Sequence, residues 1–172
     1  AYVAVGTGVG VGAIVDGRPL SSHSHPEIGH ISVRRHPEDT FGGVCPFHGD
    51  CIEGLASGPS LAQRWGRSTR ELADVLDTAV AIEASYLGQL LATVTYALVP
   101  DRIILGGGVT KIPGVLDGAR RALRAEIAGA LGTSHPSSTD TFVTLPRMGD
   151  LAGVHGALEL AHSSHRRLAR QH

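Results

Sequence analysis

The segment C-P-F-H-G-D-C restricts the possible folds of this chain more than any other feature. Cys45, His48 and Cys51 stand at even intervals, and Pro46 and Gly49 allow the backbone to turn so that two thiols and an imidazole converge. Zinc prefers tetrahedral coordination by nitrogen and sulfur, and structural zinc sites have four protein ligands. The segment therefore predicts a structural zinc site that needs one further ligand.

The fourth ligand must come from elsewhere in the chain, and the segment alone does not select it. His30, His36, His23 and His25 are the candidates. A disulfide between the two cysteines is the alternative, but thiols that flank a histidine at this spacing favour a metal.

The surrounding loop has no hydrophobic period from His36 to Asp50, and it is rich in Pro, Gly and His. Loops of this length inside compact domains are usually functional or disordered. Because metal binding supplies folding energy, we expect removal of the metal to disorder residues from about His36 to Cys51.

Composition places the chain among globular proteins. It has 172 residues, of which 42% are hydrophobic and 18% charged, enough for one domain or one lobe of a larger protein. The formal net charge of -1 gives no basic field for nucleic acid. No apolar run of about 18 residues is present, and the opening residues do not read as a signal peptide, so we expect a cytoplasmic protein without a membrane partner. The opening at Ala1 reads as a strand entered midway, which predicts an excised fragment.

Strands and helices alternate along the sequence, which predicts an α/β fold without internal repeats. The long helix, centred on Glu83 to Leu98, is expected to be a core or dimer element, because polar residues interrupt its apolar period. The expected strands are Tyr2–Val5, a second hairpin strand through Ala13–Val15 with a turn at Asp16-Gly17, Ile31–Val33, Arg102–Leu105 and Thr141–Leu145. The expected helices are Ile52–Ala56, Gly58 to Gly66, Thr69–Val99, Pro113–Leu131 and Leu151–Ser164.

Two glycine-rich loops follow predicted strands. In the first, Thr7 lies between Gly6 and Gly8, and backbone N–H groups in such a turn can hold a phosphate. In the second, Gly106–Gly108 follow a buried strand, where the absence of side chains lets a nucleotide approach the backbone. Either loop alone can also be a simple tight turn.

Three polar residues lie next to these features: Glu27, His30 and Glu53. Carboxylates and an imidazole near phosphate donors can hydrogen-bond to vicinal sugar hydroxyls. Without further context they can equally be surface groups.

Taken together and in this order, several segments resemble the ROK family of repressors and sugar kinases, over Val3 to about Ala161. The run E-I-G-H to C-P-F-H-G-D-C-I-E-G is similar to the fructokinase branch, whereas glucokinases and repressors of the family more often carry C-x-C-G-x-x-G-C. The matching segments are Gly6–Leu20, Pro26–His30, Cys45–Pro59, Asp101–Val109 and Gly149–Ala161.

The resemblance implies an actin-like, ribonuclease-H-like ATPase fold with two lobes, of which residues 1–172 form the C-terminal lobe, with a zinc loop within 30–53. It implies that His30 completes the zinc site with Cys45, His48 and Cys51, and that Glu27, His30 and Glu53 face the sugar. Nucleotide would contact Gly6, Thr7, Gly8, Pro59, Gly106, Gly107 and Gly108.

The resemblance further implies a homodimeric fructokinase that uses ATP with magnesium and phosphorylates the 6-hydroxyl of fructose. The family's first phosphate loop and its aspartate general base have no match in this sequence. We therefore expect the base upstream of Ala1 and no catalytic residue in this chain, which would be inactive alone. Asp150 is interpreted as structural or nucleotide-side. Another hexose kinase such as glucokinase, a sugar-sensing repressor, and a zinc-stabilised interaction domain are the alternatives.

Overall fold

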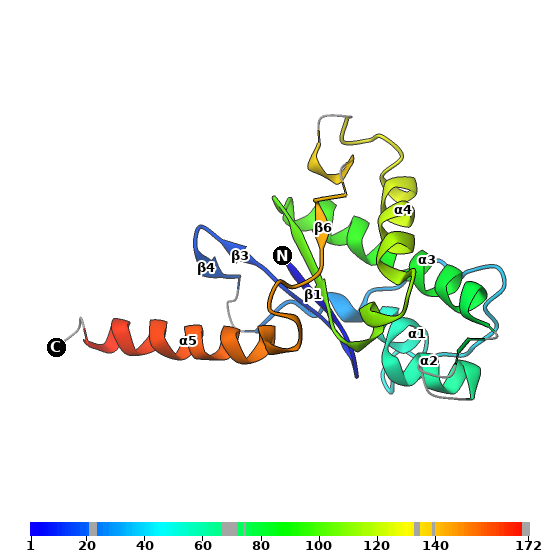
Figure 1. Cartoon of the computed structure of the whole chain (residues 1–172), viewed down its shortest axis with the longest axis horizontal. Coiled ribbons are helices and arrows are strands. Elements are labelled where there is room, and N and C mark those ends of the chain that lie inside the picture. Colours follow the sequence, from blue (N-terminus) through cyan, green and yellow to red (C-terminus); the bar gives the residue numbers. More distant parts are fainter. Residues whose placement is uncertain (21–23, 67–71, 74, 133–134, 139, 170–172) are drawn as a thin grey trace.

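A computed structural model describes residues 1–20, 24–66, 72–73, 75–132, 135–138 and 140–169. Within these residues the main sheet has the strands β1 (Tyr2–Val5), β2 (Val9–Gly12), β5 (Ile103–Gly106) and β6 (Val143–Thr144), in the order β2-β1-β5-β6. β2 pairs antiparallel with β1, whereas β1, β5 and β6 run parallel. The fold is mixed α/β, as the sequence predicts, with helices and strands alternating from residue 76 onward (Figure 1).

A second, small hairpin continues from the main sheet. It pairs β3 (Ile14–Val15) with β4 (Arg18–Pro19). Asp16 and Gly17 both have positive φ, at 49° and 73°, which is the conformation of a type I′ hairpin turn. The predicted turn at this dipeptide is confirmed.

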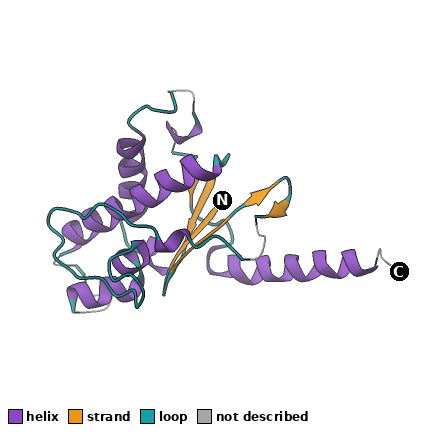
Figure 2. Ribbon diagram, turned by 180° about the vertical axis from the view of Figure 1, so that it is seen from behind, coloured by secondary structure: helices purple, strands orange, loops and turns teal. Residues whose placement is uncertain are grey.

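Five α-helices follow in the described part of the chain. α1, α2, α3 and α4 lie together beside the sheet, and α5 extends away from them (Figures 1 and 2). Their bounds are α1 Ile52–Ala56, α2 Gly58–Trp65, α3 Leu76–Leu98, α4 Val115–Ile127 and α5 Ala152–Ala169. Short 3₁₀ helices are η1 Ile28–His30, η3 Gly108–Lys111, η4 Pro136–Ser138 and η5 Gly149–Leu151.

Helix α2 has the ends that its sequence predicts. The Ser57 side chain accepts a hydrogen bond from the backbone N–H of Ser60 at 3.4 Å, and Pro59 occupies the first turn, where no N–H partner is needed. Gly66, at a φ of 64°, ends the helix in the left-handed conformation.

Three expected elements differ from the structure. The strand expected through Ala13–Val15 as the partner of β1 lies earlier, at Val9–Gly12, and Ile14–Val15 pairs with β4 in the small hairpin. The long helix starts at Leu76 rather than Thr69: residues 67–71 and 74 lie outside the described residues, and Leu72 belongs to a turn closed by a hydrogen bond from Val75. The expected strand at Ile31–Val33 is irregular. The carbonyl of Ile31 accepts from the first residue of α1 at 3.0 Å, so no neighbouring strand takes this bond.

Helices α3 and α4 cross very closely above the sheet. The side chains of Val3 and Leu105 are fully buried beneath them in the common core. A Cβ atom built on Gly88 would lie 2.4 Å from the Cβ of Ala122, and one on Gly118 would lie 2.8 Å from that of Ala84. Glycine at both positions is therefore what permits this crossing distance.

The replacement Gly88→Ala is expected to destabilise the fold by about 1–3 kcal/mol, because the added methyl group forces the two helices apart. Gly156→Ala in α5 is the matched control. Its Cβ would meet nothing within 4 Å, so helix propensity alone should leave stability unchanged or raise it by up to about 1 kcal/mol. Urea unfolding followed by circular dichroism measures both; equal behaviour of the two variants would contradict the close crossing.

A buried ion pair fastens the start of the loop that precedes the cysteines. The Asp39 carboxylate accepts hydrogen bonds from Arg64 of α2, at 3.0 Å from both Nε and Nη2, and from the Tyr86 hydroxyl of α3 at 2.6 Å. Arg64 also donates to the carbonyl of Leu55 at 2.7 Å. The side chains of Asp39 and Arg64 are 2% and 5% exposed. We call Asp39, Arg64 and Tyr86 the buried clamp.

Glu83 lies near the clamp and is completely buried, and neither of its side-chain oxygens has a hydrogen-bond partner. Burial raises the pKa of this carboxyl well above its usual value, although the Arg64 charge opposes the effect. Burial therefore favours the neutral form of the Glu83 side chain. Burial, followed by the hydrogen bond to Asp39, likewise raises the pKa of Tyr86 to about 12.

None of the helices in the described ranges combines the length and the apolar character that a bilayer crossing requires.

Candidate functional site

His30, Cys45, His48 and Cys51 form a compact cluster of possible metal ligands. One ligand atom from each lies within 4.8 Å of all the others. The His30 Nδ1 atom is 3.7 Å from the Cys45 Sγ and 3.6 Å from the Cys51 Sγ, and the His48 Nδ1 atom is 3.8 Å from the Cys45 Sγ. Standard Zn–S and Zn–N bonds in a tetrahedron place nitrogen and sulfur about 3.6 Å apart. These three nitrogen–sulfur distances are close to that value, so the residues fit a zinc ion.

The local backbone explains why these side chains converge. Cys45 and Gly49 exchange two backbone hydrogen bonds, of 3.1 and 2.9 Å, which close a narrow turn around His48. Gly49 has a φ of 67°, a conformation that favours glycine. η1 brings His30 to the cluster from the other side of the loop. The turn that the sequence predicts at Pro46 and Gly49 is thus confirmed.

The two thiols have different surroundings. Burial raises the pKa of Cys45, but the backbone N–H groups of His48 and Phe47 oppose it, and the net result is a lowered pKa. Burial raises the pKa of Cys51, and the neighbouring Cys45 raises it further. A cation between the two sulfurs would favour thiolate at both, which is the form that binds metal.

The alternative fourth ligands lie elsewhere. The His36 Nδ1 atom accepts a hydrogen bond from the backbone N–H of Glu38 at 3.3 Å, and His25 pairs with Glu27 at 2.8 Å. His23 falls outside the described residues. Of the four candidates, the structure brings only His30 to the cysteines among the residues that it describes.

The two candidate sugar-facing carboxylates are placed differently. Glu27 is exposed and lies between two imidazoles, 2.8 Å from the Nε2 of His25 and 4.0 Å from that of His30. Glu53 reaches the first glycine turn: its Oε2 accepts from the backbone N–H of Val9 at 3.0 Å, and a Cβ on Gly8 would lie 2.6 Å from that oxygen. Glu53 therefore joins the cysteine loop to the glycine turn, although the sequence places it beside the former alone.

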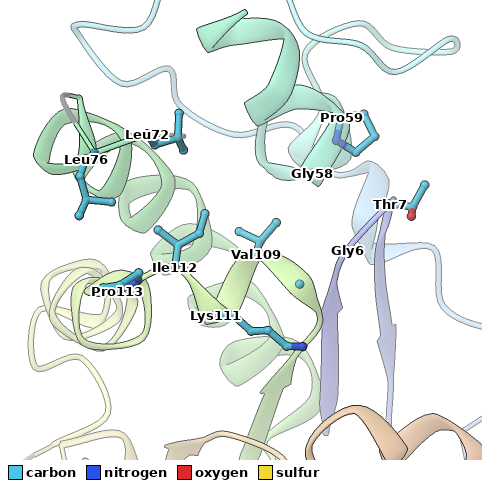
Figure 3. A pocket seen from close by; sticks show the side chains of 12 residues that line it. Gly6, Thr7, Gly58, Pro59, Leu72, Leu76, Val109, Lys111, Ile112 and Pro113 are labelled. Atoms are coloured by element: carbon cyan, nitrogen blue, oxygen red, sulfur yellow. The ribbon is translucent and has the colours of Figure 1, made fainter. Parts of the chain in front are cut away.

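A cavity of about 740 Å³ opens where the two glycine loops meet. Gly6, Thr7, Gly58, Pro59 and Gly108 line one part of it, and the backbone N–H of Gly58 donates to the carbonyl of Gly6 at 2.7 Å. The α2 start and the first glycine turn are thereby held together (Figure 3).

The other candidate nucleotide residues lie outside this lining. Gly8 contacts Glu53, Gly106 contacts the Tyr2 hydroxyl, and Gly107 lies against the backbone of Val5, with a φ of 100°. Gly106 and Gly107 permit close packing of the β1 and β5 ends. Of the second loop, Gly108 is among the residues that line the cavity.

The remaining wall of the cavity is formed by residues that the sequence motifs do not single out. Most are apolar, and they come from the segment after the glycine run and from the turn before α3. They are Leu72, Ala73, Leu76, Val109, Lys111, Ile112 and Pro113. The signal that could have found four of them is their position directly after Gly106–Gly108, where a strand end commonly meets a ligand.

Comparison with known proteins matches residues 1–164 to the ROK family. A putative fructokinase of Bacillus subtilis is 43% identical over 164 residues, which cover 95% of this chain and 54% of that protein. A fructokinase of Zymomonas mobilis is 42% identical over 162 residues, or 93% of this chain and 53% of that protein. The chain thus spans about half the length of the curated relatives that it matches.

Solved structures agree with this assignment. The ROK hexokinase from Thermus thermophilus superposes with a TM-score of 0.72 at 28% identity, covering 94% of this chain and 57% of that one. A ROK family glucokinase from Streptomyces griseus, in complex with glucose and AMPPNP, has a TM-score of 0.70 at 24% identity, covering 92% and 59%. The expected actin-like fold is confirmed by these similarities. By sequence and by structure, this chain belongs to the ROK family.

Proposed function

We propose that this chain is the C-terminal lobe of an ATP-dependent sugar kinase that phosphorylates fructose at the 6-hydroxyl. The observation that carries the proposal is the cavity at which Gly6-Thr7, Gly58 and Gly108 meet. The relatives named fructokinase, at 42–43% identity, support the choice of sugar. The C-P-F-H-G-D-C loop supports the fructokinase branch of the family in the same direction.

ATP would occupy the cavity with its base among the apolar residues and its phosphates toward the glycine turn. Leu72, Leu76, Ile112 and Pro113 form the apolar part of the lining. Backbone N–H groups of a glycine turn can donate to phosphate oxygens without steric obstruction. Magnesium would bind the phosphates together with other groups, since no carboxylate is among the described residues that line the cavity.

The sugar would bind near Glu27, His30 and Glu53. Glu53 follows the cysteine loop and contacts the glycine turn. It would therefore fix the position of the sugar-binding part of the site relative to the phosphate-binding part. The zinc ion would be held by His30, Cys45, His48 and Cys51 and would supply a fixed geometry to this loop rather than chemistry. We therefore propose zinc as a structural cofactor.

The general base would be an aspartate of the other lobe. Phosphoryl transfer requires a group that orients or deprotonates the attacking hydroxyl, and general-base assistance typically contributes about 100- to 10,000-fold. Among the described residues that line the cavity, none is a group of this kind. The lobe alone would accordingly be inactive.

The test is a coupled ADP-release assay with the full-length protein that contains this chain and a panel of hexoses. We expect fructose to give the highest kcat/KM. The replacement Glu53→Ala is expected to weaken both fructose and ATP binding, because its carboxylate touches the glycine turn as well as the loop. The 172-residue chain alone is the negative control. Turnover with this chain alone would contradict the placement of the base, and fructose binding without any ATP turnover would favour a sugar-sensing protein.

A further inference from the structure

Lys111 is the sole lysine of the chain. The sequence has 15 lysine and arginine residues in total, and all of the others are arginines. It ends η3, directly after the second glycine loop, and lines the cavity. Figure 3 shows its side chain extending beneath Val109 toward the strand that ends near Gly6. The one ε-amino group of the sequence is thus located at the candidate nucleotide cavity.

The amino group is paired with a carboxylate that lies outside the cavity lining. The Lys111 Nζ atom is 2.6 Å from Oδ1 and 2.8 Å from Oδ2 of Asp150, which belongs to η5. The two side chains are 62% and 78% exposed. Ion pairs this exposed are screened by water and contribute little, so a more highly charged partner can displace the aspartate.

Among the described residues that line the cavity, no side chain other than that of Lys111 is charged. Apart from Lys111, the lining consists of glycines, apolar residues and the neutral Thr7. A nucleoside triphosphate has several negative charges, and backbone N–H groups alone do not neutralise them. Figure 3 shows Lys111 between the apolar residues Ile112 and Pro113 and the glycine turn at Gly6. The phosphate chain of a nucleotide bound as proposed would leave the nucleoside in this region.

We propose that Lys111 is a phosphate-binding residue, and that it exchanges its ion pair with Asp150 for a phosphate of the bound nucleotide. Asp150 then acts as a competitor that holds the amino group in the empty site. The proposal rests on the proposed nucleotide function of the cavity. It adds a cationic contact that neither glycine loop provides.

The test compares three variants of the full-length protein by titration calorimetry with ATP and with adenosine. Lys111→Met is expected to weaken ATP binding about tenfold, the loss of one charge-assisted hydrogen bond, and to leave adenosine binding unchanged. Asp150→Asn is expected to tighten ATP binding two- to fivefold, because the competing carboxylate is removed. Arg124→Met is the matched control: it also removes an exposed cation, one that pairs with Asp140 and does not line the cavity, and it should bind ATP as the unaltered protein does.

Amine modification gives a second readout. Acetylation of Lys111, followed by peptide mass spectrometry, should be slowed by saturating ATP and not by saturating adenosine. If ATP binds and Lys111→Met binds it equally well, or if ATP gives no protection, the Lys111 proposal is wrong while the nucleotide function stands. Equal losses for ATP and adenosine would place Lys111 at the nucleoside and also overturn it. If the unaltered protein binds no ATP, the proposed function itself fails.

Discussion

Replacing Asp39 by Asn is expected to lower the free energy of unfolding by about 3–5 kcal/mol, the typical effect of removing one partner from a buried ion pair. The asparagine keeps the shape of the side chain but leaves the Arg64 charge without a counter-charge at 5% exposure. The Nη1 atom of Arg64 already has no hydrogen-bond partner in the unaltered protein. Chemical unfolding of the variant measures the loss directly.

Two further variants separate this effect from a general sensitivity to charge removal. The double replacement Asp39→Asn with Arg64→Met should recover much of the lost stability, because no unpaired charge remains buried. Asp140→Asn breaks the exposed pair with Arg124 and should change stability by about 1 kcal/mol or less. A loss for Asp39→Asn as small as that for Asp140→Asn would mean that the clamp does not hold the loop.

The clamp also predicts a pH dependence. Burial raises the pKa of Asp39, but hydrogen bonds from Tyr86, Arg64 and the Phe41 backbone lower it more, so the folded-state pKa is below the usual value. A depressed carboxylate pKa contributes stability at neutral pH, which is lost as the pH falls below about 4 toward the folded-state pKa. The difference in stability between the unaltered protein and Asp39→Asn should therefore shrink in acid.

Removal of the zinc ion is also expected to lower the free energy of unfolding by a large amount. We expect one zinc ion per chain, and Cys51→Ala or prolonged chelation should abolish it. Apparent binding free energies of structural zinc are on the order of 10 kcal/mol in zinc-finger peptides at neutral pH, so the loss of stability should exceed that of Asp39→Asn. Elemental analysis and thermal unfolding measure the two quantities.

The buried clamp limits how much of the loop becomes disordered when the zinc ion is removed. The sequence alone predicts that metal removal disorders the loop from His36 to Cys51, but the clamp fastens its first part at Asp39 without any metal. Hydrogen exchange should therefore speed up over residues 42–52 and change little over 36–41. His25→Gln is the control, since His25 is outside the cluster and the variant should keep its zinc. A disulfide between Cys45 and Cys51 in the purified protein, or absence of zinc, would contradict the metal proposal.

Local signals predict much of this fold and site. The Asp16-Gly17 turn, the helix from Gly58 to Gly66, and the turn at Gly49 each follow from the conformational preferences of the residues themselves. The association of His30 with the cysteines came from family resemblance, because spacing along the chain does not distinguish it from the other histidines.

What the sequence does not predict depends on contacts between distant segments. Asp39 and Arg64 read as ordinary surface charges, and nothing local indicates that they meet in the interior. The contact of Glu53 with Val9 likewise spans more than forty residues. The apolar wall around Leu72 and Ile112 is built from separate segments, so no motif marks it.

The parallel pairing of β1 with β5 has a consequence for how the protein is made. Val3 pairs with Leu105, so the centre of the sheet cannot assemble until the ribosome has added roughly a hundred more residues, which takes about 5 to 20 seconds at ordinary synthesis rates. During that interval β1 has only the β2 hairpin as a partner, and an isolated hairpin is marginally stable in water. The nascent Tyr2–Val5 segment therefore remains without its parallel partner for that time, and slow translation would lengthen its exposure.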